Sequence, residues 1–403
     1  MNFIGYFGKL IQFKNHEKSE VEMRFLISSD RLKSALAKVS AVVPSKTTLP
    51  ILQDILFELK GNILYLTATD LEISVRITID PVDGEEDGAV AIPEDKLTSV
   101  IKALPEGLLL KFETVDSDRV LITTNKGGEY KMSAEPADSF PAIPESIDKT
   151  MGFGVTISGE ILKEIIEDTV FATSKEELRP ATMGVLFQFR ENEFVAVATD
   201  GYRLVKITRK GVADLRGKAD SSGVIVPAKT LQIIAKSIED EDTCEISINE
   251  KHIQFSTENI TIISRLIDEK YPNYESVIPY ENNKELVVER DLFLSTVRRV
   301  AIFANSTTNQ IKFALNPEGY IEVSAEDIDF GGSAKETLNC TYNGEPMEIA
   351  FNAKFITDIL GHLDSDRVLF KFGSPTRAAI VQPYETAEDR EVLMLVMPMR
   401  LNA

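Results

Sequence analysis

The segment LYLTATDLEISV, residues 64–75, has two counterparts with the same pattern of residue types later in the chain. The counterparts are FVAVATDGYRLV at residues 194–205 and YIEVSAEDIDFG at residues 320–331. Each segment is an alternating apolar run, a step of small residues, an acidic turn and a second alternating run, which is the two-residue period of paired strands. Thr69 and Thr199 are 130 residues apart, and Thr199 and Ala325 are 126 apart. The chain is therefore predicted to be one domain repeated three times.

Two helix patterns accompany each copy of this hairpin. The first is SSDRLKSALAKVSAVV, SGEILKEIIEDTVFAT and ERDLFLSTVRRVAIFA, with apolar residues at helical spacing. The second is AIPEDKLTSVIKAL, VIVPAKTLQIIAKSI and AFNAKFITDILGHL, in which Pro93 and Pro227 suit a first helical position and Asn352 suits an N-cap. The fold class is therefore α+β, with two helices packed on antiparallel sheets in each of three domains.

Proline-rich joints separate the copies. SFPAIPESIDK ends the first copy and YPNYESVIPYENNK ends the second, because proline cannot continue a strand ladder. We expect three repeated domains at residues 23–147, 148–281 and 282–403. Residues 1–22 precede MRFLISSD, lack the layout of a secretory signal, and are expected to be an extension outside the fold.

Composition excludes several classes of protein. The chain has 44 Lys and Arg against 64 Asp and Glu, a net charge of −20, which argues against tight phosphate binding over its whole surface. No apolar run approaches the length of a membrane span, so no membrane partner is expected. Cys244 and Cys340 are isolated and lack the spacing of a metal site, which is typical of a reducing cytosol. We expect a cytoplasmic protein.

The sequence offers few residues in a pattern that suggests catalysis. His16, His252 and His362 are the only histidines, and none has a nearby partner that would suggest a triad or a zinc site. No glycine-rich phosphate loop occurs, so no cofactor, metal or catalytic residue is predicted. The repeated acids Asp70, Asp200 and Glu326 favour the capping of tight turns, although a metal site built on them stays open.

Ten segments, taken in order, carry a family resemblance. They are MRFLISSDRL, TTLPILQDILFEL, ATDLE, FPAIPE, ELRPATMGVLFQF, ATDGYRL, VIVPAK, YPNYESVIP, FNAKF and VMPMRL. From Met23 to Leu401 this ordered set resembles the bacterial DNA sliding clamp, the beta subunit of the replicative DNA polymerase. The resemblance implies a non-catalytic processivity factor of DNA replication. It would act as a head-to-tail homodimer that closes as a ring around duplex DNA without sequence specificity.

The resemblance also implies three sets of site residues. At the dimer interface, Ile101 and Met132 of one copy would meet Ile302 and Phe303 of the other. A peptide-binding pocket would capture short linear motifs of the replicative polymerase, the clamp loader, other polymerases and repair factors. Its matching positions are Arg179, Thr199, Gly201, Tyr202, Arg203, Leu204, Pro272, Val277, Met397, Pro398, Met399, Arg400 and Leu401. Basic residues on the repeated helices, and one in the SKTTLP loop, would face DNA, namely Arg31, Lys38, Lys46, Lys96, Lys102, Lys229, Lys236 and Arg298.

Two other function classes remain open at this stage. A metal-dependent phosphodiesterase would bind divalent metal saturably and lose nuclease activity on Asp200→Ala. A purely structural repeat scaffold would show no retention on circular DNA. Neither the preferred peptide motif, nor the affinities, nor the lysines that contact DNA follow from the sequence.

Overall fold

The computed structural model describes residues 23–115, 118–147, 153–190, 193–211 and 223–401, and it divides the chain into two compact units. Unit 1 holds the described residues of Met1–Gly152 and Lys236–Arg265, and unit 2 holds those of Phe153–Ala235 and Leu266–Ala403. The boundaries of the units differ from those of the sequence repeats because sheets continue from one repeat into the next. β18 pairs antiparallel with β4 of the first repeat, and β27 of the third repeat pairs with β14 of the second.

Unit 1 contains two sheets and the helices of the first repeat. Its helical segments are α1 (Ser29–Val39), α2 (Glu94–Ala103) and the 3-10 turns η1 (Pro50–Gln53) and η2 (Ala137–Ser139). Its strands are β1 (Arg24–Ser28), β2 (Asp54–Lys60), β3 (Ile63–Thr69), β4 (Ile73–Ile79), β5 (Asp83–Glu86), β6 (Gly88–Pro93), β7 (Leu109–Thr114), β8 (Arg119–Thr124), β9 (Glu129–Ser133), β10 (Glu135–Pro136), β16 (Thr243–Ile248), β17 (His252–Ser256) and β18 (Ile260–Arg265). One sheet has the order β5-β1-β7-β8-β9, and the other runs β10-β6-β2-β3-β4-β18-β17-β16 within the unit.

Unit 2 contains most of the second repeat and all of the third. Its helical segments are α3 (Gly159–Val170), α5 (Arg290–Ala301), α6 (Ala353–Gly361), η3 (Pro180–Met183) and η4 (Tyr274–Val277), while α4 (Ala228–Ser237) crosses the boundary between the units at its last turn. Its strands are β11 (Phe153–Ser158), β12 (Gly184–Arg190), β13 (Glu193–Thr199), β14 (Arg203–Lys210), β15 (Val224–Pro227), β19 (Lys284–Glu289), β20 (Gln310–Asn316), β21 (Tyr320–Asp327), β22 (Gly332–Asn339), β23 (Thr341–Tyr342), β24 (Met347–Asn352), β25 (Arg367–Phe372), β26 (Ala379–Pro383) and β27 (Arg390–Val396). The sheet orders are β15-β12-β13-β14-β27-β26-β25-β19-β23 and β22-β21-β20-β24.

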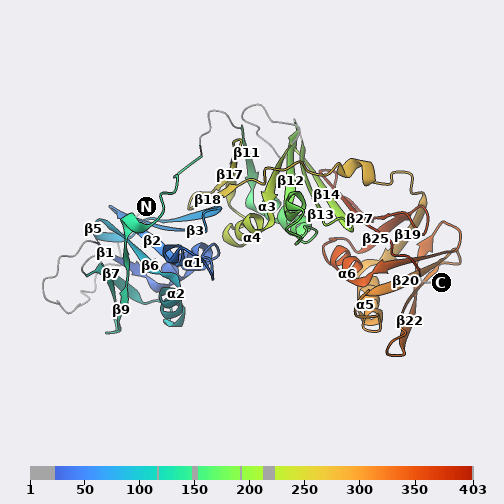
Figure 1. Cartoon of the computed structure of the whole chain (residues 1–403), viewed down its shortest axis with the longest axis horizontal. Helices are drawn as coiled ribbons and strands as arrows, with labels where there is room; N and C mark the ends of the chain where they lie inside the picture. Colours follow the sequence, from blue (N-terminus) through green and yellow to red (C-terminus); the bar gives the residue numbers. More distant parts are fainter. Residues whose placement is uncertain (1–22, 116–117, 148–152, 191–192, 212–222, 402–403) are drawn as a thin grey trace, which may run out of the picture. The chain divides into compact units, whose positions relative to one another are not determined.

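The predicted pair of helices appears in each repeat. The structure has α1 and α2 in the first, α3 and α4 in the second, and α5 and α6 in the third. Within the units, α1 packs beside α2 and α5 beside α6, as Figure 1 shows. Ser28 and Ser158 cap α1 and α3 by accepting hydrogen bonds from Arg31 N and Ile161 N, each at 3.3 Å. Pro93 lies one position earlier than predicted, because it ends β6 and is the N-cap of α2 rather than its first residue.

The three hairpins share one turn. Asp70 Oδ1 accepts hydrogen bonds from the backbone N–H of Glu72 and Ile73, and Asp200 Oδ1 accepts from Tyr202 and Arg203 in the same pattern. In the third repeat this role belongs to Asp327, whose Oδ1 accepts from Asp329 N and Phe330 N. The alignment of Glu326 with the other two acids was therefore wrong by one residue. The acids are turn caps, each held by its own backbone.

Aromatic clusters fill the core of each repeat. Phe112 stacks on Phe25 at 4.9 Å and on Phe57 at 5.9 Å between ring centroids in the first repeat. Phe189 and Phe194 stack at 4.6 Å in the second, and Phe293 packs against Phe313 at 5.2 Å in the third. Fully burying one such ring contributes about 1.5–3 kcal/mol, so each repeat has its own source of stability.

Asp54, at the start of β2, makes stability depend on pH. The side chain is 6% exposed, and burial together with nearby Glu135 raises the pKa of its carboxyl from 3.8 to about 6. The folded protein therefore binds this proton more tightly than the unfolded chain, and the free energy of unfolding falls as the pH rises from about 3.8 to 6. We expect Asp54→Asn to raise the free energy of unfolding at pH 7.5 by about 1–3 kcal/mol.

Urea unfolding at a series of pH values checks this expectation. The gain from Asp54→Asn should shrink as the pH falls from 6 toward 4, because wild-type Asp54 is then already protonated. Asp364→Asn, on an exposed loop, is the matched control and should change stability little at any pH. A gain from Asp54→Asn that is equally large at pH 4 would rule out the titration as its cause.

Candidate functional site

The end of the C-terminal strand joins the second and third repeats within unit 2. β27 pairs with β14 up to the Arg203–Val396 partners, and Met397 N then donates to Tyr202 O at 2.8 Å. Two residues later, Met399 N donates to Ala350 O of β24 at 2.7 Å. The terminal segment is thus fixed by backbone bonds on both sides, and the predicted residues of the ATDGYRL and VMPMRL segments do come together.

The β13–β14 turn holds Tyr202 outward. Thr199 Oγ1 accepts from Gly201 N at 3.0 Å and donates to Arg203 O at 2.7 Å. Gly201 has φ +89°, a left-handed conformation that glycine adopts without strain. Tyr202 is 57% exposed, and its ring stacks on Phe355 of α6 at 5.9 Å. The turn therefore exposes one face of the Tyr202 ring to solvent, while the other face is held by Phe355.

We name the exposed apolar residues gathered here the Tyr202 surface: Tyr202, Val277, Phe355, Met397 and Leu401. Val277 ends η4, which Tyr274 anchors in the same apolar cluster as Leu204 and Leu395. Tyr202, Val277, Met397 and Leu401 are 57%, 55%, 42% and 38% exposed, and Phe355 is partly exposed. Methionines and aromatic rings at one place form a surface that adapts to varied apolar side chains.

Arginines lie at the rim of the Tyr202 surface. The Arg179 guanidinium lies beside Gly201, since a Cβ added at Gly201 would be 3.4 Å from Arg179 Nη1, and it also pairs with Glu176 at 3.5 Å. Arg400 is exposed, and its backbone oxygen accepts from Gln310 at 3.4 Å. The predicted Pro272 is exposed as well, while Pro398 and Met399 are partly buried.

Arg203 and Leu204, also predicted at the peptide site, are largely buried beside this surface. Arg203 is 9% exposed, and its guanidinium donates to Asp200 at 3.1 Å, to Asp358 at 2.5 Å and to Phe171 O at 2.8 Å. It also lies over the rings of Phe171 and Phe355, at 5.2 and 4.9 Å. Leu204 is 2% exposed in the core. Because alternate residues of a strand point to opposite faces, Tyr202 faces solvent while Arg203 positions the turn against α6.

The sequence prediction missed the supporting residues from α3 and α6. Phe355 and Asp358 are three residues apart on α6, a spacing that places them on one helix face. His362 stacks on Phe171 at 3.9 Å, and its Nδ1 lies 2.8 Å from Asp358 O. That spacing on α6 was the only signal in the sequence, and it does not reveal which partner the face meets.

The acids of α3 are paired with arginines of neighbouring strands. Glu164 contacts both Arg209 of β14 and Arg390 of β27, and Asp168 also contacts Arg390. Burial raises the pKa of Asp168 to about 6, although Arg390 acts to lower it. Charge-assisted contacts with arginines therefore pair two of the acids of α3.

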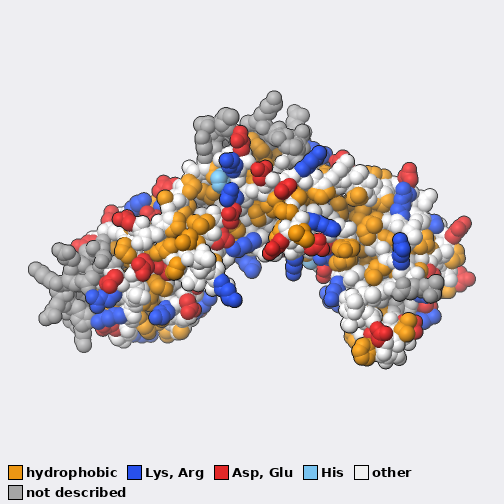
Figure 2. Space-filling view, viewed as in Figure 1, with side chains coloured by type: hydrophobic (Ala, Val, Ile, Leu, Met, Phe, Trp, Pro, Cys, Tyr) orange, Lys and Arg blue, Asp and Glu red, His pale blue; other side chains and the backbone are white. Residues whose placement is uncertain are grey.

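Two of the predicted basic residues contact protein groups, since Arg31 donates to the backbone oxygens of Asp80 and Pro81 and Lys38 pairs with Glu239 at 2.8 Å. Arg31 is nevertheless exposed, as are Lys46, Lys96, Lys102, Lys229, Lys236 and Arg298. On the face drawn in Figure 2, basic side chains are interspersed with acidic ones, which fits weak, salt-sensitive contacts better than a continuous basic groove.

The four residues predicted at a dimer interface are unequally exposed. Ile302 and Phe303 are 78% and 43% exposed at the end of α5. Ile101 and Met132 are 1% and 8% exposed in the core of unit 1, because α2 and β9 turn these side chains inward. The side chains of Ile101 and Met132 offer little surface to a partner. The outer edge of β9, the last strand of its sheet, is therefore the better candidate for the dimer contact of the first repeat.

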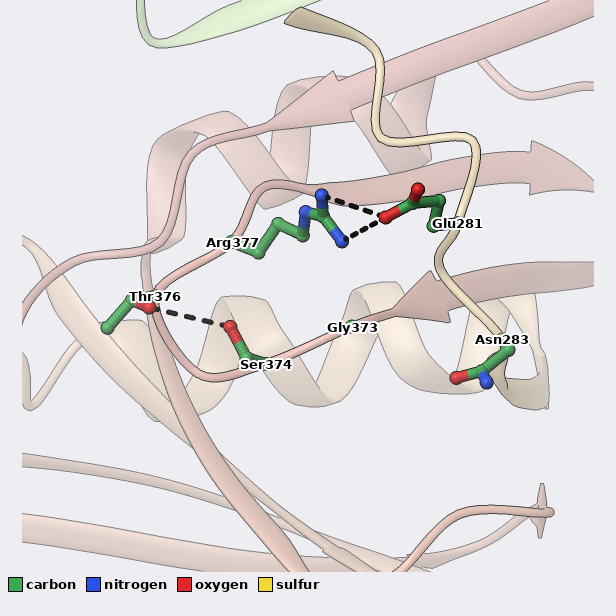
Figure 3. Close-up of a pocket in the computed structure, with 6 residues that line it drawn as sticks. All are labelled: Glu281, Asn283, Gly373, Ser374, Thr376 and Arg377. Carbon is green, nitrogen blue, oxygen red and sulfur yellow. Dashed lines mark hydrogen bonds and ion pairs between the residues drawn. The ribbon is translucent and has the colours of Figure 1, made fainter.

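A polar depression elsewhere in unit 2 does not suit apolar ligands. It encloses about 560 Å³ and is lined by Glu281, Asn283, Gly373, Ser374, Thr376 and Arg377. In Figure 3 the Arg377 guanidinium faces Glu281, with both terminal nitrogens 3.3 Å from one carboxylate oxygen. These charged groups satisfy each other, so the depression offers a peptide neither an apolar wall nor an unpaired charge.

Metal and thiol chemistry gain no support within the described residues. No three His, Cys, Asp or Glu side chains there gather as a metal site requires. Burial raises the pKa of the Cys244 thiol to about 12 and that of Cys340 to about 11, so both are uncharged at neutral pH. No helix in this part of the chain combines the length and apolarity needed to cross a bilayer. His16 lies outside the described residues.

Comparison with known proteins gives one family for all three repeats. Residues 23–144, 156–273 and 275–400 match the N-terminal, central and C-terminal domains of the DNA polymerase III beta subunit. The chain is 30% identical to the beta sliding clamp of Chlamydia pneumoniae over 380 residues, which is 94% of this chain and 100% of that protein. With the same coverage, the beta sliding clamp of Bacillus subtilis is 27% identical over 387 residues.

A solved structure agrees with the sequence comparisons. The DnaN sliding clamp of Pseudomonas aeruginosa, bound to griselimycin, superposes with a TM-score of 0.87 at 29% identity, covering 94% of this chain and 100% of that one. The predicted α+β fold with three clamp domains is thereby confirmed, as is the resemblance from which the function was predicted. The chain belongs to the family of the DNA polymerase III beta subunit, the bacterial beta sliding clamp.

Proposed function

We propose that two copies of this chain close head to tail into a ring around duplex DNA, and that the ring tethers the replicative polymerase. Membership of the beta sliding clamp family makes the chain a non-catalytic processivity subunit of DNA polymerase III. The ring is supported by one observation above all, namely the open strand edges in the first and third repeats. In unit 1 the five-stranded sheet ends at β9, and in unit 2 the four-stranded sheet ends at β22.

Open strand edges favour pairing with another chain. Each carries a row of backbone donors and acceptors that a second strand can satisfy. Among the described edge strands, β9 lies in the first repeat and β22 in the third, so β9 of one copy and β22 of the next are proposed to form a heterologous contact. Two copies with two such contacts leave neither edge open. The exposed Ile302 and Phe303, which follow α5, add an apolar component to each contact.

The charge of the chain favours topological retention on DNA over tight binding. A net charge of −20 repels the phosphate backbone at long range. The exposed basic residues Lys46, Lys96, Lys102, Lys229, Lys236 and Arg298 are proposed to line the DNA-facing side, where they weaken this repulsion. A closed ring needs no further affinity, because it leaves circular DNA only by opening.

The Tyr202 surface is proposed to capture short linear motifs of the polymerase, the clamp loader and other replication and repair proteins. Exposed methionine, tyrosine and valine side chains offer adaptable apolar contacts. Arg179 and Arg400 at the rim are placed to hold peptide carbonyls or carboxylates. We propose that this tethering takes place in the cytoplasm, where chromosomal DNA and the polymerase are found in bacteria.

Retention on DNA of different topology tests the ring. Loaded by a bacterial clamp loader with ATP onto a nicked circular plasmid, the protein should co-elute with the DNA in gel filtration. Cutting the plasmid once should release most of the protein, since it then slides off the ends. Binding without the loader should be weak and should weaken further with salt. Equal retention on circular and linear DNA would contradict encirclement.

A further inference from the structure

The first 22 residues of the chain carry an apolar stripe in their sequence. Residues 1–22 lie outside the part of the chain that the structure describes, and the family match begins only at residue 23. Apolar residues follow the spacing i, i+3, i+4, i+7 and i+8 of one helix face: Phe3, Tyr6, Phe7, Leu10 and Ile11. The positions opposite them are small or polar, namely Gly5, Gly8 and Gln12. A stripe of this kind gains stability when another apolar surface covers it.

Unit 1 has an open apolar cavity beside the strand that follows this segment. The cavity encloses about 630 Å³, and five of its nine lining side chains are apolar: Leu26, Ile27, Pro81, Val82 and Leu109. Ile27 and Val82 are 3% and 6% exposed, whereas Pro81 is exposed and the two leucines are partly exposed. Cavities of about 300–1,000 Å³ with apolar walls are the usual size of binding sites.

Hydrogen bonds hold the walls of this cavity in place. Arg31, in the first turn of α1, donates to the backbone oxygens of Asp80 and Pro81. On the other side, Val82 N donates to the backbone oxygen of Asn62 at 2.7 Å. Because residues 80–82 are fixed on both sides, the cavity is already formed, and little conformational entropy of its walls remains to be lost when it is filled.

The segment is long enough to reach the cavity. Met23 is buried and immediately precedes β1, whose Leu26 and Ile27 line the cavity three and four residues further on. A strand rises about 3.3 Å per residue, so these side chains lie within about 13 Å of Met23 along the strand. Residues 12–22 connect the stripe to Met23 and can span up to about 36 Å when extended. The chain can therefore turn back along β1 and place the stripe over the cavity.

Charge complementarity also favours this occupant. Residues 1–16 contain Lys9 and Lys14 and no acidic residue, since the acids of the segment begin at Glu17. Arg24, which pairs with Glu85 at 3.5 Å, and Arg31 are the bases beside the cavity. They are outnumbered by four exposed acids on β5 and the residue after it, namely Asp83, Glu85, Glu86 and Asp87. The rim of the cavity is therefore acidic on balance and suits a basic segment.

We propose that residues 3–11 dock in this cavity of their own chain, with the apolar stripe turned toward Leu26, Val82 and Leu109. The docked segment covers the β5 side of the five-stranded sheet, the edge opposite β9, so it leaves the proposed ring contact free. A lipid surface is the other common cover for an amphipathic stripe. The net charge of −20 opposes the approach of the chain to anionic lipid, whereas the cavity lies next to the segment in the same chain.

Photocrosslinking tests where the stripe docks. The full-length protein with p-benzoylphenylalanine in place of Phe7 should crosslink under ultraviolet light to residues 24–31, 80–87 or 108–111. In a mixture of unlabelled and isotope-labelled protein, mass spectrometry should find these crosslinks within one copy. Crosslinks to other parts of the chain, crosslinks between labelled and unlabelled copies, or the absence of any crosslink would overturn the proposal.

Hydrogen exchange of full-length variants gives an independent measure. The double variant Phe7→Ser and Leu10→Ser should speed amide exchange in residues 81–88 about ten-fold or more, because these amides lose their cover. Gly5→Ser with Gln12→Ser is the matched control, since both positions lie opposite the stripe and neither double variant changes the charge. This control should exchange like the wild type. Equal exchange in all three proteins would contradict docking.

Vesicle binding distinguishes a lipid surface from the cavity. Wild-type protein should stay in the supernatant when vesicles of phosphatidylglycerol and phosphatidylethanolamine are sedimented. Sedimentation of the wild type but not of the Phe7→Ser and Leu10→Ser variant, with equal hydrogen exchange in both, would show that the stripe serves a membrane and would overturn the proposal.

Discussion

Deleting Met397–Ala403 is expected to abolish the binding of a short Gln-Leu-x-Leu-Phe-type peptide. The deletion removes Met397 and Leu401, two of the exposed apolar residues of the Tyr202 surface, and the rim residue Arg400. It also removes the backbone bond from Met397 to Tyr202, which ties the third repeat to the second, and the bond from Met399 to Ala350 within the third repeat. Affinity should fall by about 100-fold or more, beyond detection by calorimetry, because a few central apolar contacts carry most of the energy of such complexes.

A single substitution separates the surface from the terminal segment. Tyr202→Ala removes an exposed ring while leaving the backbone bond of Tyr202 O intact, and it should weaken the peptide about 10-fold or more. Tyr384→Ala is the matched control, because Tyr384 is 44% exposed in unit 2 and stacks with Arg367 instead. The variants should remain dimeric, since neither change touches β9, β22, Ile302 or Phe303. Unchanged peptide affinity after the deletion, in a folded dimer, would mean that the peptide binds elsewhere.

The double variant Ile302→Asp and Phe303→Asp is expected to be a monomer. Both side chains are exposed in the single chain, so their replacement should cost little folding stability. In the proposed ring they are covered, and two carboxylates buried without partners cost several kcal/mol at each of the two contacts. Multi-angle light scattering at micromolar concentration should give about 44.8 kDa for the variant and twice that mass, 89.6 kDa, for the wild type.

Leu292→Asp provides the control for charge alone. Leu292 lies on the same helix, α5, and is 43% exposed, as Phe303 is. This control should therefore keep the dimer mass. A double variant that still has the dimer mass would show that the contact lies away from the end of α5. Loss of dimer in the Leu292 control as well would show that α5 tolerates no added charge, and the assignment of the contact would then have no support.

Some expectations followed directly from local patterns. The hairpins β3–β4, β13–β14 and β21–β22, and the helix pair of each repeat, follow from two- and 3.6-residue periods that any segment carries in its own sequence. The pairing of ATDGYRL with VMPMRL was also predicted, although from the family resemblance and not from periodicity. The chain's membership of that family came from ordered motifs spread from Met23 to Leu401.

One prediction was wrong because the turn of the third repeat is offset by one residue from the turns of the other two. Glu326 was aligned with Asp70 and Asp200, yet Asp327 makes the turn-capping bonds, because β21 is one residue longer than β13 before its turn. Arg203 and Leu204 stay predicted residues of the peptide site, and the structure adds that they are only 9% and 2% exposed. Arg203 pairs with Asp358 of α6, and Leu204 packs in an apolar cluster with Leu395 of β27, contacts between distant segments that no local pattern in the sequence reveals.

The sequence by itself determined the triple repeat, the α+β class and the family, since these depend on periodicity and on motifs that are local in the chain. Only the tertiary structure decided which exposed side chains form a surface. Tyr202, Phe355 and Met397 come from three distant segments, and their proximity depends on the β14–β27 pairing and on the packing of Arg203 against α6. Only the structure, likewise, shows that Asn305 ties the β21–β22 turn to the loop after α5 by donating to Asp327 and Asp329. Contacts between distant segments are set by side-chain packing in three dimensions, which a one-dimensional pattern does not encode.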